Sequence, residues 1–250
     1  MNPFYFGDAA RALYGVHHPP RGSTARSAGV VLCYPFAQEY MRAHRAFRQL
    51  SMLLSAEGFH VIRFDYSGTG DSAGDARDVS LANWDEDLVT AIEELMDSAA
   101  VESVWLVGLR LGGALALRAA ARPEVRGVVL WDPVVRGQAQ LDDAHPAREG
   151  GAGDVLELGG MPVVARLRDE FRSLDLMTTV VPADLEGLVA VSEDVVSYQQ
   201  LRDRLSGPGA DVSYQCIPSD GRWSEFDNWG SALIPQALIR AIVDYLKSRN

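Results

Sequence analysis

The segment from Val104 to Ala121, VWLVGLRLGGALALRAAA, constrains the fold of this chain more than any other stretch. It opens with the apolar run Val104–Val107, which predicts a buried strand. Leucines and alanines then recur at helical spacing. Gly108 and Gly112 bracket the junction, where the backbones of a strand and a following helix must pass close together. The segment therefore predicts a strand that turns sharply into a buried helix, with Arg110 at the tip of the turn.

The residue at this tip decides what chemistry the turn could support. Gly-x-x-x-Gly between a strand and a helix is the frame of a nucleophile elbow, whose middle residue is Ser, Cys or Asp in a working enzyme. Here that residue is Arg110. A guanidinium is protonated at any physiological pH and cannot attack a carbonyl. The sequence thus predicts the frame of a hydrolytic site without its nucleophile.

Strand and helix patterns alternate along the rest of the chain. This alternation, which ends on a helix, predicts an α/β fold with a mostly parallel sheet and helices on both faces. One domain, residues 1–250, is expected from the length. Residues 134–182 lose the alternation, and we expect a small lid insertion there. The predicted strands are 12–16, 29–34, 59–65, 104–107, 126–131, 187–192 and 211–217. One predicted helix ends at residue 57, and the others cover 80–98, 163–171, 196–205 and 232–247.

Composition excludes several classes of function. The net charge is −11 and the isoelectric point about 4.9, so neither nucleic acid nor an anionic membrane is an expected partner. Cys33 and Cys216 give no disulfide framework and no metal-ligand spacing. His17 and His18 precede two prolines, which favours a surface loop over a metal site. No apolar run is long enough to span a membrane and no signal segment is recognisable, so we expect a cytoplasmic protein.

No cofactor is expected. Gly68-Thr69-Gly70 follows a predicted strand, as phosphate-binding glycines do. The third glycine of a dinucleotide-binding motif is absent, and Asp71 would repel a phosphate. We interpret the segment as a turn.

Three motifs together carry a resemblance to a known family. They are PFAQEY after the strand at 29–34, RFDYSGTGDS at residues 63–72, and GLRLGG at the elbow. Their order resembles the α/β-hydrolase superfamily and, more narrowly, its serine-aminopeptidase-like branch. The elbow is similar to that of hydrolase-like proteins associated with the exosortase A system, and similar proteins are encoded beside natural-product assembly lines. The resemblance covers nearly the whole chain, is specific for residues 29–132, and implies the α/β-hydrolase fold.

The resemblance also implies where three catalytic residues should stand. The nucleophile position holds Arg110, and the acid position after the strand at 187–192 can be filled by Asp194 or Glu193. The histidine should lie in residues 218–229, and that loop contains none. Ordinary Ser-His-Asp hydrolysis is therefore not expected.

Two interpretations of Arg110 stay open. It could fold back on Asp194 or Glu39 as a decayed position. Alternatively, it could clamp an anion together with the N–H groups of Leu111 and Phe36, because the N-terminus of a helix favours negative charge.

Three functional hypotheses stay open. The first, which corresponds to the anion clamp, is that the protein binds or transforms an acyl or anionic small molecule, or an acyl-carrier-bound intermediate of a biosynthetic pathway, by non-serine chemistry. The second is an inactive scaffold partner, and a third is a hydrolase, thioesterase or acyltransferase with another nucleophile, Cys33 being the first candidate. The sequence leaves the oligomeric state open, with a dimer as one alternative. Weak acid–base candidates for the first hypothesis are Glu39, His44, Tyr66, Asp132 and Asp194.

Overall fold

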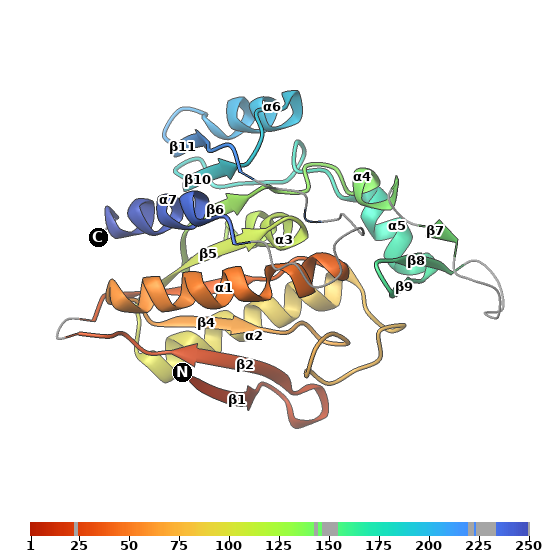
Figure 1. The fold of residues 1–250 in the computed structure, drawn as a ribbon, viewed down its shortest axis with the longest axis horizontal. Coiled ribbons are helices and arrows are strands. Elements are labelled where there is room, and N and C mark those ends of the chain that lie inside the picture. The colour runs from red at the N-terminus through yellow and green to blue at the C-terminus, as the bar shows by residue number, and fades with distance from the viewer. Residues whose placement is uncertain (23–24, 143–144, 147–154, 220–222, 224–233, 250) are drawn as a thin grey trace.

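A computed structural model describes the chain apart from residues 23–24, 143–144, 147–154, 220–222, 224–233 and 250. Within the described residues, eight strands form one sheet (Figure 1), in which the first two neighbouring pairs of the spatial order are antiparallel and the other five pairs are parallel. The α/β prediction with a mostly parallel sheet is confirmed. The strands in spatial order are β1 (Asn2–Phe6), β2 (Leu13–His18), β4 (Val61–Phe64), β3 (Ala28–Cys33), β5 (Ser103–Leu109), β6 (Val125–Trp131), β10 (Glu186–Val191) and β11 (Asp211–Cys216).

Helices pack against both faces of this sheet. Gly29 on β3 faces Leu95 of one helix. The residue after Gly29, Val30, pairs with Trp105 on the neighbouring strand, and Trp105 contacts Tyr245 of another helix. Neighbouring residues of a strand point to opposite faces, so the two helices lie on opposite sides. The helices outside the insertion are α1 (Gln38–Ala56), α2 (Leu81–Ala99), α3 (Leu111–Arg118), α6 (Val196–Leu205) and α7 (Gln236–Lys247), with a short 3₁₀ turn at Ala9–Arg11.

The described residues between β6 and β10 form a small group of elements at one end of the sheet (Figure 1), and Phe171 joins this group to the main core. This is the segment for which we expected a lid. Its short strands pair antiparallel with one another and not with the main sheet. It contains α4 (Gly137–Asp142), β7 (His145–Pro146), β8 (Leu156–Leu158), β9 (Met161–Val163) and α5 (Ala165–Ser173).

One local expectation was wrong, and one strand was not expected. His17 and His18 lie in β2 and not in a surface loop, and His18 is buried beside Arg63. Strand β1 was not predicted from the sequence. It contains a proline and forms the outer edge of the sheet, where a missing backbone N–H is tolerated. No helix in the described part of the chain is long and apolar enough to cross a membrane.

Candidate functional site

Arg110 lies at the predicted turn between β5 and α3, in a backbone conformation that non-glycine residues rarely adopt. Its φ is 54° and its ψ is −117°. The flanking glycines explain how the turn is accommodated. A Cβ at Gly112 would lie 2.1 Å from the carbonyl oxygen of Cys33, and one at Gly108 would lie 2.2 Å from that of Gly112. Both positions therefore require glycine, and the strain is concentrated at Arg110.

The side chain of Arg110 is paired inside the protein. Its Nε donates to Oε1 of Glu39 at 2.9 Å, and Nη1 donates to the backbone oxygen of Asp132 at 3.3 Å. Glu39 is buried, and the Arg110 side chain is 23% exposed. Burial favours a neutral guanidine, but the charge and hydrogen bond of Glu39, with contributions from Tyr198 and Asp132, outweigh it and raise the pKa of Arg110.

This pairing changes one sequence-based expectation. The anion-site hypothesis required an uncompensated positive charge at the elbow. Glu39, not Asp194, is the partner of Arg110, and a guanidinium with a buried carboxylate at 2.9 Å adds little net attraction for an anion. The expected positive cluster is therefore compensated within the protein.

Asp132 is the centre of a second group of buried contacts. It directly follows β6 and has a φ of 40°. Its Oδ1 accepts from the backbone N–H of Ser192 at 2.6 Å and from the Ser192 hydroxyl at 2.9 Å. Its Oδ2 accepts from the indole Nε1 of Trp223 at 3.0 Å. Burial raises the pKa of Asp132, while these three hydrogen bonds oppose the shift.

Asp194 and His44, two of the predicted catalytic candidates, lie elsewhere. The Asp194 carboxylate accepts from the Tyr214 hydroxyl at 2.6 Å in an exposed position, and this bond lowers its pKa. His44 stacks on Tyr34 at 6.3 Å, and its pKa is lowered by burial. Of the predicted acid–base candidates, the structure brings only Glu39 and Asp132 to Arg110.

Two backbone N–H groups near the turn are not used by the fold. Among the described residues, neither the backbone N–H of Leu111 nor that of Phe36 has a hydrogen-bond acceptor within the protein. Phe36 precedes Ala37, which has a φ of 57° and a ψ of −131°, nearly the conformation of Arg110. The two donors that we predicted for an oxyanion thus flank two similarly strained turns.

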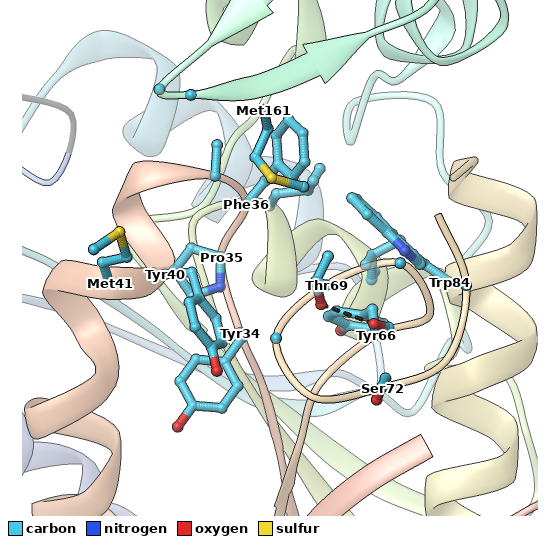
Figure 2. A pocket seen from close by; sticks show the side chains of 18 residues that line it. Tyr34, Pro35, Phe36, Tyr40, Met41, Tyr66, Thr69, Ser72, Trp84 and Met161 are labelled. Carbon is cyan, nitrogen blue, oxygen red and sulfur yellow. Dashed lines mark hydrogen bonds between the residues drawn. The ribbon is translucent and has the colours of Figure 1, made fainter. Parts of the chain in front are cut away.

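A cavity of about 480 Å³ opens beside these donors. Figure 2 shows Tyr40 and Met41 on one side of it and Thr69, Tyr66 and Ser72 on the other. Its wall is mostly apolar and aromatic, and it includes the Gly159–Met161 turn of the insertion. Apolar wall residues that matter below are Phe36, Trp84, Leu111, Leu115 and Met161.

Cys33 is not available as an alternative nucleophile. Its thiol is fully buried, and burial raises its pKa to about 12. A thiol attacks as the thiolate, so a pKa this high leaves it inert at neutral pH.

Comparison with known proteins identifies the family. The family model described as serine aminopeptidase, S33, matches residues 26–157, more than half of the chain. The chain belongs to this family. The match includes the first strong strand, the elbow and Asp132, but it stops before Ser192 and Trp223.

Curated relatives of this serine aminopeptidase S33 member match over a shorter stretch. The palmitoyl-protein thioesterase ABHD10, mitochondrial, of Homo sapiens is 37% identical over 100 residues, which are 40% of this chain and 31% of the relative. The protein of the same name from Rattus norvegicus is 41% identical over 68 residues, 27% of this chain and 22% of the relative. The chain thus spans less than a third of the length of these relatives.

Solved structures establish the fold over the full length. Est1E from Butyrivibrio proteoclasticus with ferulic acid bound has a TM-score of 0.77 at 14% identity, covering 98% of both chains. The alpha/beta hydrolase domain-containing protein 10 from mouse has a TM-score of 0.61 at 18% identity, covering 99% of this chain and 98% of that one. The predicted superfamily and branch are confirmed.

Within this serine aminopeptidase S33 member, sequence reasoning missed Trp223 as a site residue. It lies in the C-terminal loop in which we looked for a histidine. One signal was present, since a tryptophan in a polar loop is a candidate for burial and a buried indole N–H usually finds a hydrogen-bond partner. That partner, Asp132, is 91 residues away in sequence.

Proposed function

We propose that this chain binds an acyl group in the cavity beside α3 and does not hydrolyse the ester or thioester that carries it. In this proposal the chain is a hydrolase-fold protein with a degenerate catalytic triad. One observation carries it: Trp223 donates to Asp132 from the loop in which the family places its histidine.

The base position cannot take a proton. A catalytic histidine donates one ring N–H to the acid and uses its second nitrogen to accept the proton of the nucleophile. The indole of Trp223 reproduces only the first half, because its single nitrogen is a donor and has no lone pair to offer. Asp132, with its three hydrogen bonds, has the partners of the acid in this arrangement.

The nucleophile position is equally inert. Arg110 cannot form an acyl intermediate, and its bonds to Glu39 and to the Asp132 carbonyl hold it in place. With both the attacking group and the proton acceptor missing, water would have to attack unaided.

Several features support retained binding. The unused N–H groups of Leu111 and Phe36 suit the carbonyl oxygen of an acyl group. The strained backbone at Arg110 and Ala37, which costs of order 1–3 kcal/mol at each residue, is the kind of feature that persists at functional sites. The relatives are palmitoyl-protein thioesterases by name, which points to acyl thioesters as a ligand class. A carrier-bound acyl group of a biosynthetic pathway fits the same site.

The internal Arg110–Glu39 pair favours a second candidate, a scaffold partner that binds no small molecule. The cavity of about 480 Å³ favours acyl binding over the scaffold role, because a scaffold partner does not need a cavity beside its oxyanion donors.

Triad reconstruction tests the proposal. The wild type, Arg110→Ser, Trp223→His and the double variant are assayed on p-nitrophenyl butyrate, with circular dichroism to confirm folding. We expect turnover only in the double variant, and its loss when Asp132→Asn is added. Appreciable turnover by the wild type, or by Arg110→Ser alone, would contradict a degenerate triad.

A further inference from the structure

Three hydroxyl groups in the wall of the cavity share a property that bears on its ligand. Tyr40, Thr69 and Ser72 each donate their proton to a fixed acceptor in the protein. The Tyr40 hydroxyl donates to Oδ1 of Asp65 at 2.7 Å, Thr69 Oγ1 to the backbone oxygen of Tyr66 at 2.8 Å, and Ser72 Oγ to that of Asp65 at 2.6 Å. None of these three protons is left for a ligand.

A hydroxyl whose proton is committed faces a ligand only as an acceptor. Ser72 also accepts from the backbone N–H of Tyr14 at 2.8 Å, so its oxygen is largely used. Within the described part of the chain no group donates to the hydroxyl oxygen of Tyr40 or Thr69, so both keep free lone pairs. They come from facing sides of the cavity, Tyr40 from α1 and Thr69 from the loop after β4 (Figure 2).

The direction of the Tyr40 bond is fixed by its partner. Asp65 is buried and also accepts from the backbone N–H of Asp71 at 3.0 Å through its other oxygen. If the Tyr40 hydroxyl turned toward a ligand acceptor, Oδ1 of Asp65 would lose its donor inside the protein. A buried carboxylate oxygen without a donor is unfavourable, so Tyr40 stays an acceptor for the ligand.

The remaining wall excludes a strongly polar ligand. Phe36, Trp84, Leu111, Leu115 and Met161 surround the same space, and a charged group there would lose its hydration without a counter-ion. The wall therefore combines apolar surface with isolated hydrogen-bond acceptors.

We propose that the cavity selects an acyl chain that carries a hydrogen-bond donor, a hydroxyl or an N–H group, over a plain alkanoyl chain of the same length. Tyr40 and Thr69 are the specificity-determining residues. This inference rests on the proposed acyl-binding function and names the ligand class of the same site.

The test compares matched ligands by calorimetry. The probes are the N-acetylcysteamine thioesters of octanoic acid and of the positional isomers of hydroxyoctanoic acid, titrated into the wild type. We expect the best isomer to bind about tenfold more tightly than octanoyl, as one additional hydrogen bond of about 1.4 kcal/mol implies. Thr69→Val, which keeps the shape and removes the acceptor, or Tyr40→Phe should bring the ratio of hydroxyoctanoyl to octanoyl affinity down to about one.

The control is Thr90→Val, since Thr90 makes a similar bond to the Glu86 carbonyl on α2, outside the cavity wall. It should keep the full preference. If octanoyl binds but no hydroxylated isomer binds more tightly, or if Thr69→Val and Tyr40→Phe together keep the preference, this inference is wrong and acyl binding stands. If none of the thioesters binds, the proposed function itself fails.

Discussion

Arg110 and Glu39, 71 residues apart in sequence, are joined by a 2.9 Å hydrogen bond between Nε and Oε1 behind the turn of β5 into α3. The bond ties the first turn of α1 to the tip of the elbow. An ion pair thus stands where a hydrolase has its exposed nucleophile, and each of the two charges depends on the other as its counter-ion.

Glu39→Gln should destabilise the protein by about 3–5 kcal/mol, because it leaves the Arg110 charge without its buried counter-ion. The double variant Glu39→Gln/Arg110→Met should recover most of this loss, since it removes the charge as well. Urea unfolding measures both. Asp75→Asn breaks the exposed Arg77–Asp75 pair and serves as the control with no measurable change. Equal stabilities of the wild type and Glu39→Gln would show that the pair is not formed in solution.

The same variant is expected to gain anion affinity. With Glu39 neutral, Arg110 and the N-terminus of α3 no longer have a compensating charge, so phosphate should bind to Glu39→Gln and not to the wild type. Calorimetric titration with phosphate measures this. Phosphate binding by the wild type that Arg110→Ala removes would restore the anion-site hypothesis that the ion pair now argues against.

Gly112→Ala should be among the most damaging single changes, with a loss of on the order of 4 kcal/mol or failure to fold. The added Cβ would lie 2.1 Å from the Cys33 oxygen, in a buried crossing of two backbones that cannot separate. Gly207→Ala is the matched control, since a Cβ there meets nothing within 4 Å. Thermal melting of the two variants distinguishes them, and similar melting temperatures would mean that the elbow is looser than described.

Cys33 should resist alkylation in the native protein. Full burial and a pKa raised to about 12 leave almost no thiolate, whereas Cys216 is only partly buried. Mass spectrometry after iodoacetamide treatment should find Cys216 modified first and Cys33 modified only in denaturant. Rapid native modification of Cys33 would reopen it as a nucleophile.

His18 should make the protein less stable as the pH falls. Burial, then the charge of Arg63, lowers its pKa from 6.5 to about 4. The unfolded chain therefore binds more protons between pH 6.5 and pH 4, and the free energy of unfolding falls through this window by up to about 3 kcal/mol. His18→Gln should flatten this slope, because the glutamine oxygen still accepts from Arg63 and does not titrate. Unfolding curves at pH 7 and pH 4.5 measure the effect, and an unchanged slope would show that His18 is solvated in solution.

The elbow could be predicted from sequence because its requirements are local. Glycine spacing, an apolar strand and a helical repeat all lie within residues 104–121, and Arg110 stands where they place it. The parallel sheet followed from alternation in the same way. Strand β1 did not, since its pairing with β2 depends on the edge of the finished sheet.

The contacts of the site were less predictable because they join distant segments. The family resemblance implied Asp194 or Glu193, after β10, as the acid, but the Asp194 side chain is exposed and bonds Tyr214. Asp132 instead reaches Ser192 and Trp223 across 60 and 91 residues. No periodicity or motif encodes such partners, which are set by the order of β6, β10 and β11 in the sheet.

The most direct test of the account combines binding and turnover in one sample of wild-type protein. Octanoyl N-acetylcysteamine is titrated while the fluorescence of the tryptophans, including Trp84 in the cavity wall, reports binding and a thiol reagent reports released N-acetylcysteamine. The account predicts saturable binding that Leu115→Trp, which fills the cavity, weakens, with thiol release no faster than in buffer. Thiol release that depends on enzyme concentration, with multiple turnovers, would contradict it.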